Sequence, residues 1–323
     1  MYRFAFALLA FCLAAGSASA QSDWPTKPIR FVIPYPAGSF ADITMRIMQQ
    51  KLVPLLGQQI VVDNRSGASG DIGTEILFRA APDGYNFGIA TNSTHGVSPA
   101  LNPNLPYNAV NDFAMVSLIG AAPYVLITSP QLPANSVKEL IALAKAKPGG
   151  LSYASAGPAS LAHLAGALFS QMAGVQLTEV PYRSSAQSVL DTSEGRIDLQ
   201  FGTMGPVLPH VKSGKVKALA VTGLKRAAVL PDVPTLDESG LSGFEASLWL
   251  AVVAPGKTPP AIVERMNREV KKVLADPDVV AALKLQGIEA TPTTPDELRA
   301  RIEHDIAKWK KLAQETGITM ESK

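Results

Sequence analysis

The chain has 323 residues, enough for two domains of ordinary size, and its 29 Lys and Arg nearly balance its 27 Asp and Glu. No basic run exceeds two residues, so the clustered charge that nucleic acid binding needs is missing, and nucleic acid is excluded as an expected partner. The single cysteine, Cys12, lies within the first 20 residues. The remainder therefore has no disulfide, cysteine nucleophile or thiolate metal site.

The first 20 residues have the pattern of an export signal. Arg3 supplies a positive start, residues 4–15 form an apolar run, and Ala18-Ser19-Ala20 is a small-residue cleavage site. The run is too short for a membrane anchor, because a spanning helix needs about 20 apolar residues. We expect residues 1–20 to be removed after export. Because Arg3 is their only charged residue, the remaining chain has a net charge near +1.

From Ile29 onward, strand-like runs alternate with helical patterns. We predict strands over 29–35, 60–64 and 86–91, with helices over 42–56 and 70–80 between them. This alternation is typical of crossover units on a mostly parallel sheet.

Two strand-like runs, 115–119 and 124–128, then follow one another and predict a crossing out of the first domain. The alternation restarts beyond them with a helix that begins at Ser136, where Glu139 completes a capping-box pattern. A second α/β unit is predicted from strands over 151–156, 177–182 and 197–203 and helices over 160–173 and 184–194.

Strands over 216–222 and 248–254 flank a proline-rich crossing back to the first domain, where helices beginning near Thr258 and Thr294 should pack. The predicted division is a signal peptide over 1–20, domain 1 over 21–128 plus 224–323, and domain 2 over 129–223. The predicted fold class is α/β, with a ligand cleft between two lobes. Ligands of such sheets lie beyond the carboxyl ends of the strands, so the loops there are the candidate site.

The loop after the first strand leads directly into a helix, and its backbone N–H groups together with the positive helix end predict an anion site. Asp42 is more readily explained as a helix-start residue than as a ligand contact. Phe40 has no evident core role and is expected to cover an apolar part of the ligand. Ser69 lies in a second glycine-rich turn, which matches neither a phosphate loop nor a nucleophile elbow. A tight turn is the favoured interpretation of that segment, and it is compatible with lining the cleft.

Further polar groups follow a strand in each lobe: Thr91, Asn92, Ser93 and His95 in the first, and Ser155, Gly157, Ser160 and His163 in the second. Each could be a helix cap on its own, but their recurrence at strand ends favours a cleft that holds a carboxylate with neutral donors. The four histidines lack metal-ligand spacing, so no metal and no cofactor is expected.

Several phrases together resemble the Bug receptors, the periplasmic solute-binding components of the tripartite tricarboxylate transporter family, over nearly the whole chain. They are WPTKPIR at 24–30, PAG at 36–38, VDNR at 62–65, AAPDGY at 80–85, VPY at 180–182, LPDVPT at 230–235 and SGFE at 242–245. The resemblance implies a periplasmic, non-enzymatic protein with a two-domain Venus flytrap fold of type II. It also implies a small carboxylate ligand and transient docking on a two-subunit membrane transporter. We expect one cleft in a monomer.

The predicted ligand-binding residues, from spacing and resemblance together, are Tyr35, Ala37, Gly38, Ser39, Phe40, Asp42, Ser69, Thr91, Asn92, Ser93, His95, Ser155, Gly157, Ser160, His163, Tyr182, Gly202 and Thr203. Two features depart from many family members: Ser39 and Phe40 follow Gly38, and Gly202 stands after Phe201 where an aspartate is frequent. Without that aspartate to receive a ligand amine, we expect an acid without a positive group.

Two alternative functions stay open at this point. One is a ligand sensor for a membrane signalling partner, which would use the same fold and cleft. The other is a secreted hydrolase that would use Ser69 or Ser155 with His95 or His163, although no nucleophile motif supports it.

Overall fold

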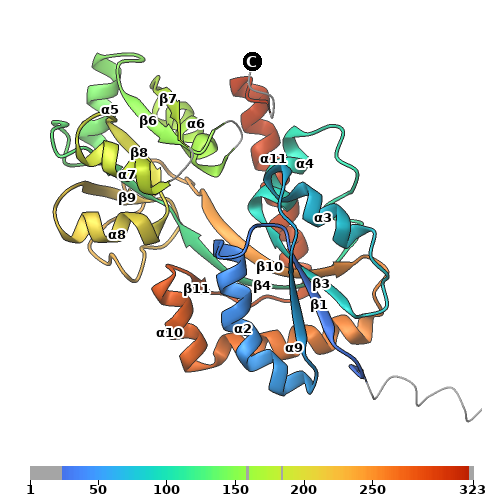
Figure 1. Ribbon diagram of the computed structural model, residues 1–323. Coiled ribbons are helices and arrows are strands. Elements are labelled where there is room, and N and C mark those ends of the chain that lie inside the picture. The colour runs from blue at the N-terminus through green and yellow to red at the C-terminus, as the bar shows by residue number, and fades with distance from the viewer. Residues whose placement is uncertain (1–23, 158–159, 183–184, 320–323) are drawn as a thin grey trace, which may run out of the picture.

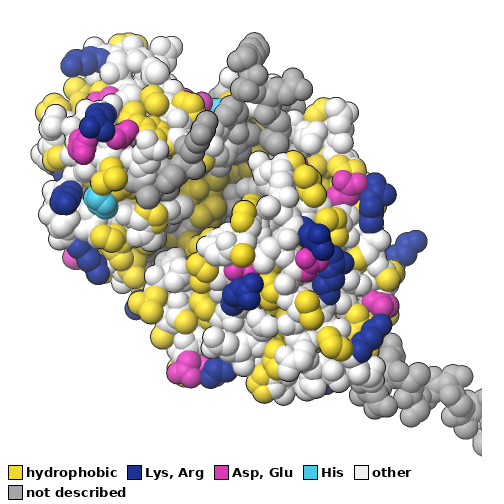
Figure 2. All heavy atoms as spheres, in the orientation of Figure 1, with side chains coloured by type: hydrophobic (Ala, Val, Ile, Leu, Met, Phe, Trp, Pro, Cys, Tyr) yellow, Lys and Arg dark blue, Asp and Glu magenta, His cyan; other side chains and the backbone are white. Residues whose placement is uncertain are grey.

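A computed structural model describes residues 24–157, 160–182 and 185–319, so the predicted signal peptide lies outside the described residues. Two sheets form the centres of two lobes (Figure 1). The first lobe contains a six-stranded sheet of order β11-β4-β10-β3-β1-β2, and the second lobe contains a five-stranded sheet of order β7-β6-β8-β5-β9. Figure 2 shows the surface hollowed between the lobes, with hydrophobic side chains in the hollow.

The strands of the first lobe are β1 (Ile29–Ile33), β2 (Ile60–Asn64), β3 (Asn86–Thr91), β4 (Phe113–Pro123), β10 (Ser247–Pro255) and β11 (Glu289–Ala290). Its helices are α2 (Phe40–Leu56), η1 (Ala68–Gly70), α3 (Asp71–Phe78), the π-helix η2 (Ser93–Val97), α4 (Ser98–Leu101), α9 (Pro260–Ala275), α10 (Pro277–Leu285) and α11 (Pro295–Thr316).

The strands of the second lobe are β5 (Val125–Thr128), β6 (Ser152–Ser155), β7 (Thr178–Pro181), β8 (Leu199–Gly202) and β9 (Lys217–Val221). Its helices are α5 (Val137–Ala146), α6 (Leu161–Ala173), α7 (Ser185–Ser193) and α8 (Met204–Lys212).

Both sheets are mixed, and the crossover units within them are parallel as predicted. Strand β1 pairs in parallel with β2 and β3, and β6 pairs in parallel with β7 and β8. Strands β10 and β5 run antiparallel to their neighbours, because each is the strand through which the chain enters from the other lobe. The carboxyl ends of three parallel strands in each lobe therefore share one edge of the sheet, where the candidate site was predicted.

The chain crosses between the lobes twice, and Thr222 ties the two crossings together. One crossing runs from β4 to β5 through Tyr124, and the other covers residues 222–246 between β9 and β10. The buried Thr222 hydroxyl donates to the Ala246 carbonyl at 2.7 Å and accepts from the Tyr124 N–H at 2.8 Å. The predicted domain boundaries stay a prediction, and β5, which they place in domain 1, pairs with β8 and β9 of the second sheet.

Helix α11 contacts the cores of both lobes. Leu298 and Ile302, near its start, pack in a first-lobe cluster, whereas Trp309 and Leu312 join a cluster formed largely by second-lobe side chains. Its start is fixed as predicted, since Thr294 and Glu297 form a capping box and proline occupies the first turn. Among the described residues, no helix is long and apolar enough to cross a membrane.

Candidate functional site

The loops that follow β1, β2 and β3 meet around the hydroxyl of Tyr35. This hydroxyl lies 2.9 Å from Thr91 Oγ1 at the end of β3, and it donates to the Ser69 carbonyl at 3.3 Å. Gly70 allows the close approach, because a Cβ there would lie 2.6 Å from Thr94 Cγ2 and 3.2 Å from the Tyr35 ring. The structure therefore brings together three predicted positions, Tyr35, Ser69 and Thr91.

Asp42 organises the loop between β1 and α2. Its side chain is buried, and Oδ2 accepts from the Gly38 N–H and from Arg46 Nε, each at 2.9 Å, while Oδ1 accepts from Asn64 Nδ2 at 3.1 Å. Burial alone would raise the pKa of Asp42, but the hydrogen bonds and the Arg46 charge outweigh burial and hold the pKa below its ordinary value. The carboxylate is therefore charged and engaged within the protein, in line with the predicted role at the helix start.

Two N–H groups of the predicted anion site are already used inside the loop. The Gly38 N–H donates to Asp42, and the Ser39 N–H donates to the Pro36 carbonyl at 3.1 Å. Ser39 is the N-cap of α2. The N–H groups left at the positive end of α2 are those of Phe40 and Ala41, which have no acceptor earlier in the helix.

The turn after β2 holds its backbone in the left-handed region over four consecutive residues, with φ of 137° at Gly67, 46° at Ala68, 55° at Ser69 and 103° at Gly70. The two residues with side chains each cost about 1–2 kcal/mol there, and such strain is concentrated at functional sites. Ser69 is exposed. The turn is tight, as predicted, and it presents the Ser69 side chain at the strand-end edge.

His95 differs from its predicted role, because it is only 1% exposed and packs edge-on against Phe113 with 4.8 Å between ring centroids. Its Nδ1 lies 2.9 Å from Thr94 Oγ1, and burial lowers its pKa to about 3, so the ring is neutral. Within the described part of the chain, His95 Nε2 and both amide atoms of the buried Asn92 have no hydrogen-bond partner. The half-buried Ser93 is more accessible than either residue.

In the second lobe, the side chain of Ser155 is committed to protein partners. Its hydroxyl donates to Glu179 Oε1 and accepts from the Gly157 N–H at 2.8 Å. His163 Nε2 lies 3.7 Å from Glu179 Oε2. Ser160 is the N-cap of α6 and accepts from the His163 N–H. The predicted polar cluster is therefore present at the end of β6, but Glu179 lies at its centre and was not predicted.

The remaining predicted positions follow β7 and β8. The Tyr182 hydroxyl donates to Asp191 of α7 at 2.8 Å. Gly202 is packed, because a Cβ there would lie 2.4 Å from Val207 Cγ2, and Thr203 is the N-cap residue of α8 without a capping side-chain bond. An aspartate at position 202 would therefore require the Val207 side chain to shift.

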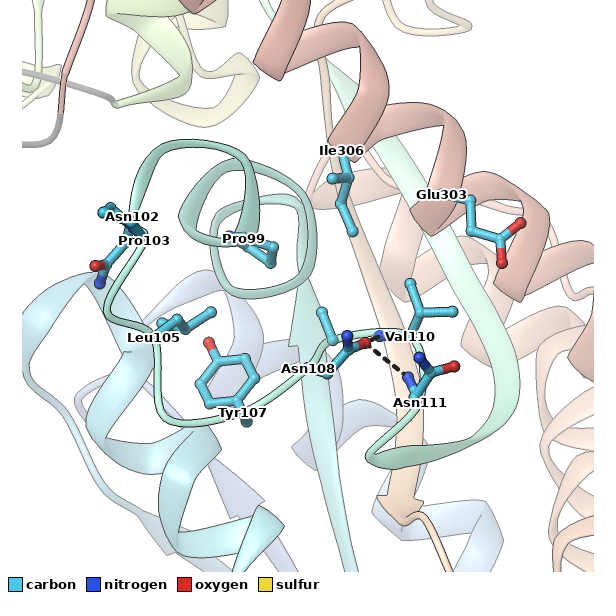
Figure 3. A pocket seen from close by; sticks show the side chains of 11 residues that line it. Pro99, Asn102, Pro103, Leu105, Tyr107, Asn108, Val110, Asn111, Glu303 and Ile306 are labelled. Atoms are coloured by element: carbon cyan, nitrogen blue, oxygen red, sulfur yellow. Dashed lines mark hydrogen bonds between the residues drawn. The ribbon is translucent and has the colours of Figure 1, made fainter.

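A separate cavity of about 550 Å³ lies between the segment 99–111 and α11 (Figure 3). Figure 3 shows Leu105 and Tyr107 on one side of it and Ile306 of α11 on the other. Its lining contains no predicted site residue. The hollow that Figure 2 shows between the lobes is a different region of the surface.

The contacts of Ser155 and His95 differ from those of a serine–histidine pair. Ser155 donates to a carboxylate rather than to a histidine, and the imidazole of His95 is buried beside Thr94. Among the described residues, no group of three or more His, Cys, Asp or Glu could hold a metal ion. The described side chains at this edge offer hydrogen-bond donors and acceptors.

Asn64 and Glu179 are the residues of this region that sequence reasoning missed. Asn64 Nδ2 bridges the Tyr35 carbonyl and Asp42, and its position as the last residue of β2 was a usable signal. Glu179 reaches Ser155 through the parallel register of β6 and β7, for which the sequence offered no signal.

Comparisons with known proteins agree over nearly the whole chain. The family described as "Tripartite tricarboxylate transporter family receptor" matches residues 44–318. Protein BugT of Bordetella pertussis is 37% identical over 310 residues, 95% of each chain. A solved R. palustris protein with adipate is 34% identical, with a TM-score of 0.79 over 92% of this chain and 99% of that one. MatC from Rhodopseudomonas palustris with bound malate is 29% identical, with a TM-score of 0.74 over 90% and 99% of the chains.

These likenesses confirm the predicted α/β fold of two lobes, the type II flytrap of periplasmic binding proteins, and the predicted resemblance. The chain belongs to the tripartite tricarboxylate transporter receptor family, whose Bug members are solute-binding proteins.

Proposed function

We propose that this chain is a periplasmic receptor that captures one small carboxylate-containing solute between its lobes and releases it unchanged to a two-subunit membrane transporter. The observation that carries the proposal is the family match over residues 44–318, joined to a strand-end edge where polar groups from three loops of the first lobe meet. Adipate and malate in two related structures support a carboxylate as the ligand class.

The proposed contact for the ligand carboxylate is the first lobe. Ser69 and the N–H groups at the start of α2 supply donors there, and the helix dipole favours a negative charge at that end. The charge of Asp42 is neutralised by Arg46 and by two further hydrogen bonds, so it does not repel the ligand as a bare carboxylate would. Closure of the lobes about the two crossings would then sequester the ligand.

Thermal unfolding tests this function. The protein is first unfolded and refolded to strip bound ligand, then melted with mono-, di- and tricarboxylates, aromatic acids and amino acids. A ligand at a hundred times its dissociation constant adds about 2.7 kcal/mol of stability, which is seen as a raised midpoint. Stabilisation by an acid would support the proposal, and the absence of any response to every acid would refute it.

A further inference from the structure

The carboxylate of Glu179 lies beside the carboxyl end of β6, one of the strand ends where the ligand is proposed to bind. Strands β6 and β7 are parallel, with Tyr153 opposite Glu179 and Ser155 opposite Pro181. Paired residues of parallel strands point to the same face, as do residues two apart, so Glu179 and Ser155 share a face. The Ser155 hydroxyl at the end of β6 donates to Glu179 Oε1, which fixes the carboxylate at that end.

Ser155 has no remaining donor for a ligand. Its only O–H is given to Glu179, and its oxygen accepts from the Gly157 N–H. The Glu179 carboxylate and the His163 imidazole of this cluster stay partly accessible, with side chains that are 25% and 15% exposed.

The negative charge of Glu179 is only weakly offset by a neighbouring positive charge. Within the described part of the chain, its one ion-pair partner is His163, at 3.7 Å between Oε2 and Nε2. Burial lowers the pKa of His163 and the Glu179 charge raises it, and burial outweighs the charge, so the ring is neutral near neutral pH. The pair then carries one negative charge.

We propose that Glu179 determines specificity at the far end of the ligand, selecting an acid whose other end carries a hydrogen-bond donor, a hydroxyl or an ammonium, over a matched dicarboxylate. A charged carboxylate only accepts hydrogen bonds, so it pairs with such donors and repels a second carboxylate at close range. This inference rests on the proposed function, in which the first lobe holds the ligand's own carboxylate.

The glycine at position 202 does not prevent the protein from selecting a ligand with a donor at its far end. Its Cβ position is filled by Val207, so position 202 offers no acceptor for a ligand amine. Glu179 supplies the missing acceptor from β7 on the same sheet edge, two residues before the strand ends. An amine-bearing acid therefore belongs to the proposed ligand class, contrary to the expectation from Gly202 alone.

The test uses calorimetric titration of the refolded, ligand-stripped protein near neutral pH. Each set of acids has one chain length and consists of the plain monocarboxylate, its terminal hydroxy and amino derivatives, and the dicarboxylate. Comparison of the affinities for the hydroxy acid and the amino acid identifies which donor is preferred. We expect one of them to bind about tenfold or more tightly than the matched dicarboxylate.

Glu179→Gln keeps the shape of the side chain and removes its charge. We expect this variant to bind the dicarboxylate about tenfold more tightly than the wild type does and the amino derivative more weakly. Glu194→Gln is the matched control, because its exposed side chain pairs with Arg196 and lies between α7 and the amino end of β8, the opposite edge of the sheet. The control should leave the ratio of affinities unchanged.

The wild type alone offers a second measurement if Glu179→Gln does not fold. Protonation of His163 cancels the Glu179 charge, and burial lowers the pKa of His163, so the preference against the dicarboxylate should weaken progressively as pH falls below about 6.5. The Glu179 carboxylate faces the imidazole at 3.7 Å. The nearby Tyr153 hydroxyl donates to the His163 backbone carbonyl at 3.4 Å, and it stays protonated over this range because burial raises its pKa. An unchanged preference over this range would count against the inference.

The outcomes separate this inference from the proposed function. If acids bind but the dicarboxylate is preferred, and Glu179→Gln leaves that preference unchanged, only the role of Glu179 is overturned. If no acid binds the wild type, the proposed function fails and the inference fails with it.

Discussion

Replacement of Asp42 by asparagine tests whether this residue positions the loop or faces the ligand. The carboxylate accepts three hydrogen bonds, from Gly38, Arg46 and Asn64, and its side chain is buried. Asparagine has one acceptor oxygen and adds an NH₂ group, so at least one donor loses its acceptor and meets another donor instead. We therefore expect Asp42→Asn to disturb the loop that precedes α2.

The size of the effect follows from these contacts. The Arg46 side chain is 51% exposed, so its pair with Asp42 contributes only about 0.5 kcal/mol. The bonds from Gly38 and Asn64 contribute about 1–1.5 kcal/mol each. The free energy of unfolding should fall by about 2–3 kcal/mol, and ligand affinity should fall about tenfold as the donors at the start of α2 shift.

Chemical unfolding and calorimetric titration measure both quantities. Asp63→Asn is the control. Asp63 is likewise an aspartate of the first lobe that forms salt bridges, in its case with Arg30 and Arg65, but it lies outside the predicted site. The control should lose stability without losing affinity. If Asp42 faced the ligand, removal of its charge would strengthen carboxylate binding, and that result would refute the positioning role.

Three further substitutions test packing and buried charge. Gly202→Ala should cost about 1–3 kcal/mol of stability in a thermal melt, and adding Val207→Ala should restore part of it; an unchanged melting midpoint would contradict the packing seen here. Burial lowers the pKa of His95 in the folded protein. The stability that neutral His95 confers is therefore complete above its unfolded pKa of about 6.5, and it decreases as pH decreases, by at most about 1.4 kcal/mol per pH unit. His95→Leu should flatten that slope in urea titrations, and equal slopes would count against it. Burial raises the pKa of Glu245, but Lys308 and Arg301 outweigh burial and depress it. Glu245→Gln should therefore cost about 3 kcal/mol near neutral pH and progressively less as pH falls below about 4, and a pH-independent cost would refute this pairing.

The alternation of strands and helices was readable from sequence because each crossover unit has its own apolar period. Strands 60–64 and 86–91 were predicted with the bounds observed, and α6 began one residue from its predicted start. Helix α8 was missed because Pro206 and Pro209 argue against a helix. The packing of Met204 and Val207 in the second-lobe core outweighs that local preference.

The candidate site was predictable in place but less so in chemistry. Strand ends located Tyr35, Ser69 and Thr91, because parallel strands bring their following loops to one edge. The burial of His95 depends on packing, and the hydrogen bond from Ser155 to Glu179 depends on the register of two strands. Neither can be predicted from the spacing of residues in the sequence. The π-helix η2 that places His95 inward likewise has no distinct sequence pattern.

The most direct test of the central claim is calorimetric titration of the stripped protein with the acid that most raises its melting midpoint, followed by chemical analysis of the recovered ligand. The account predicts saturation at one molecule per chain and recovery of the same acid. Conversion of the acid to a product, or no saturable binding at all, would contradict a receptor that holds a carboxylate between its lobes and releases it unchanged.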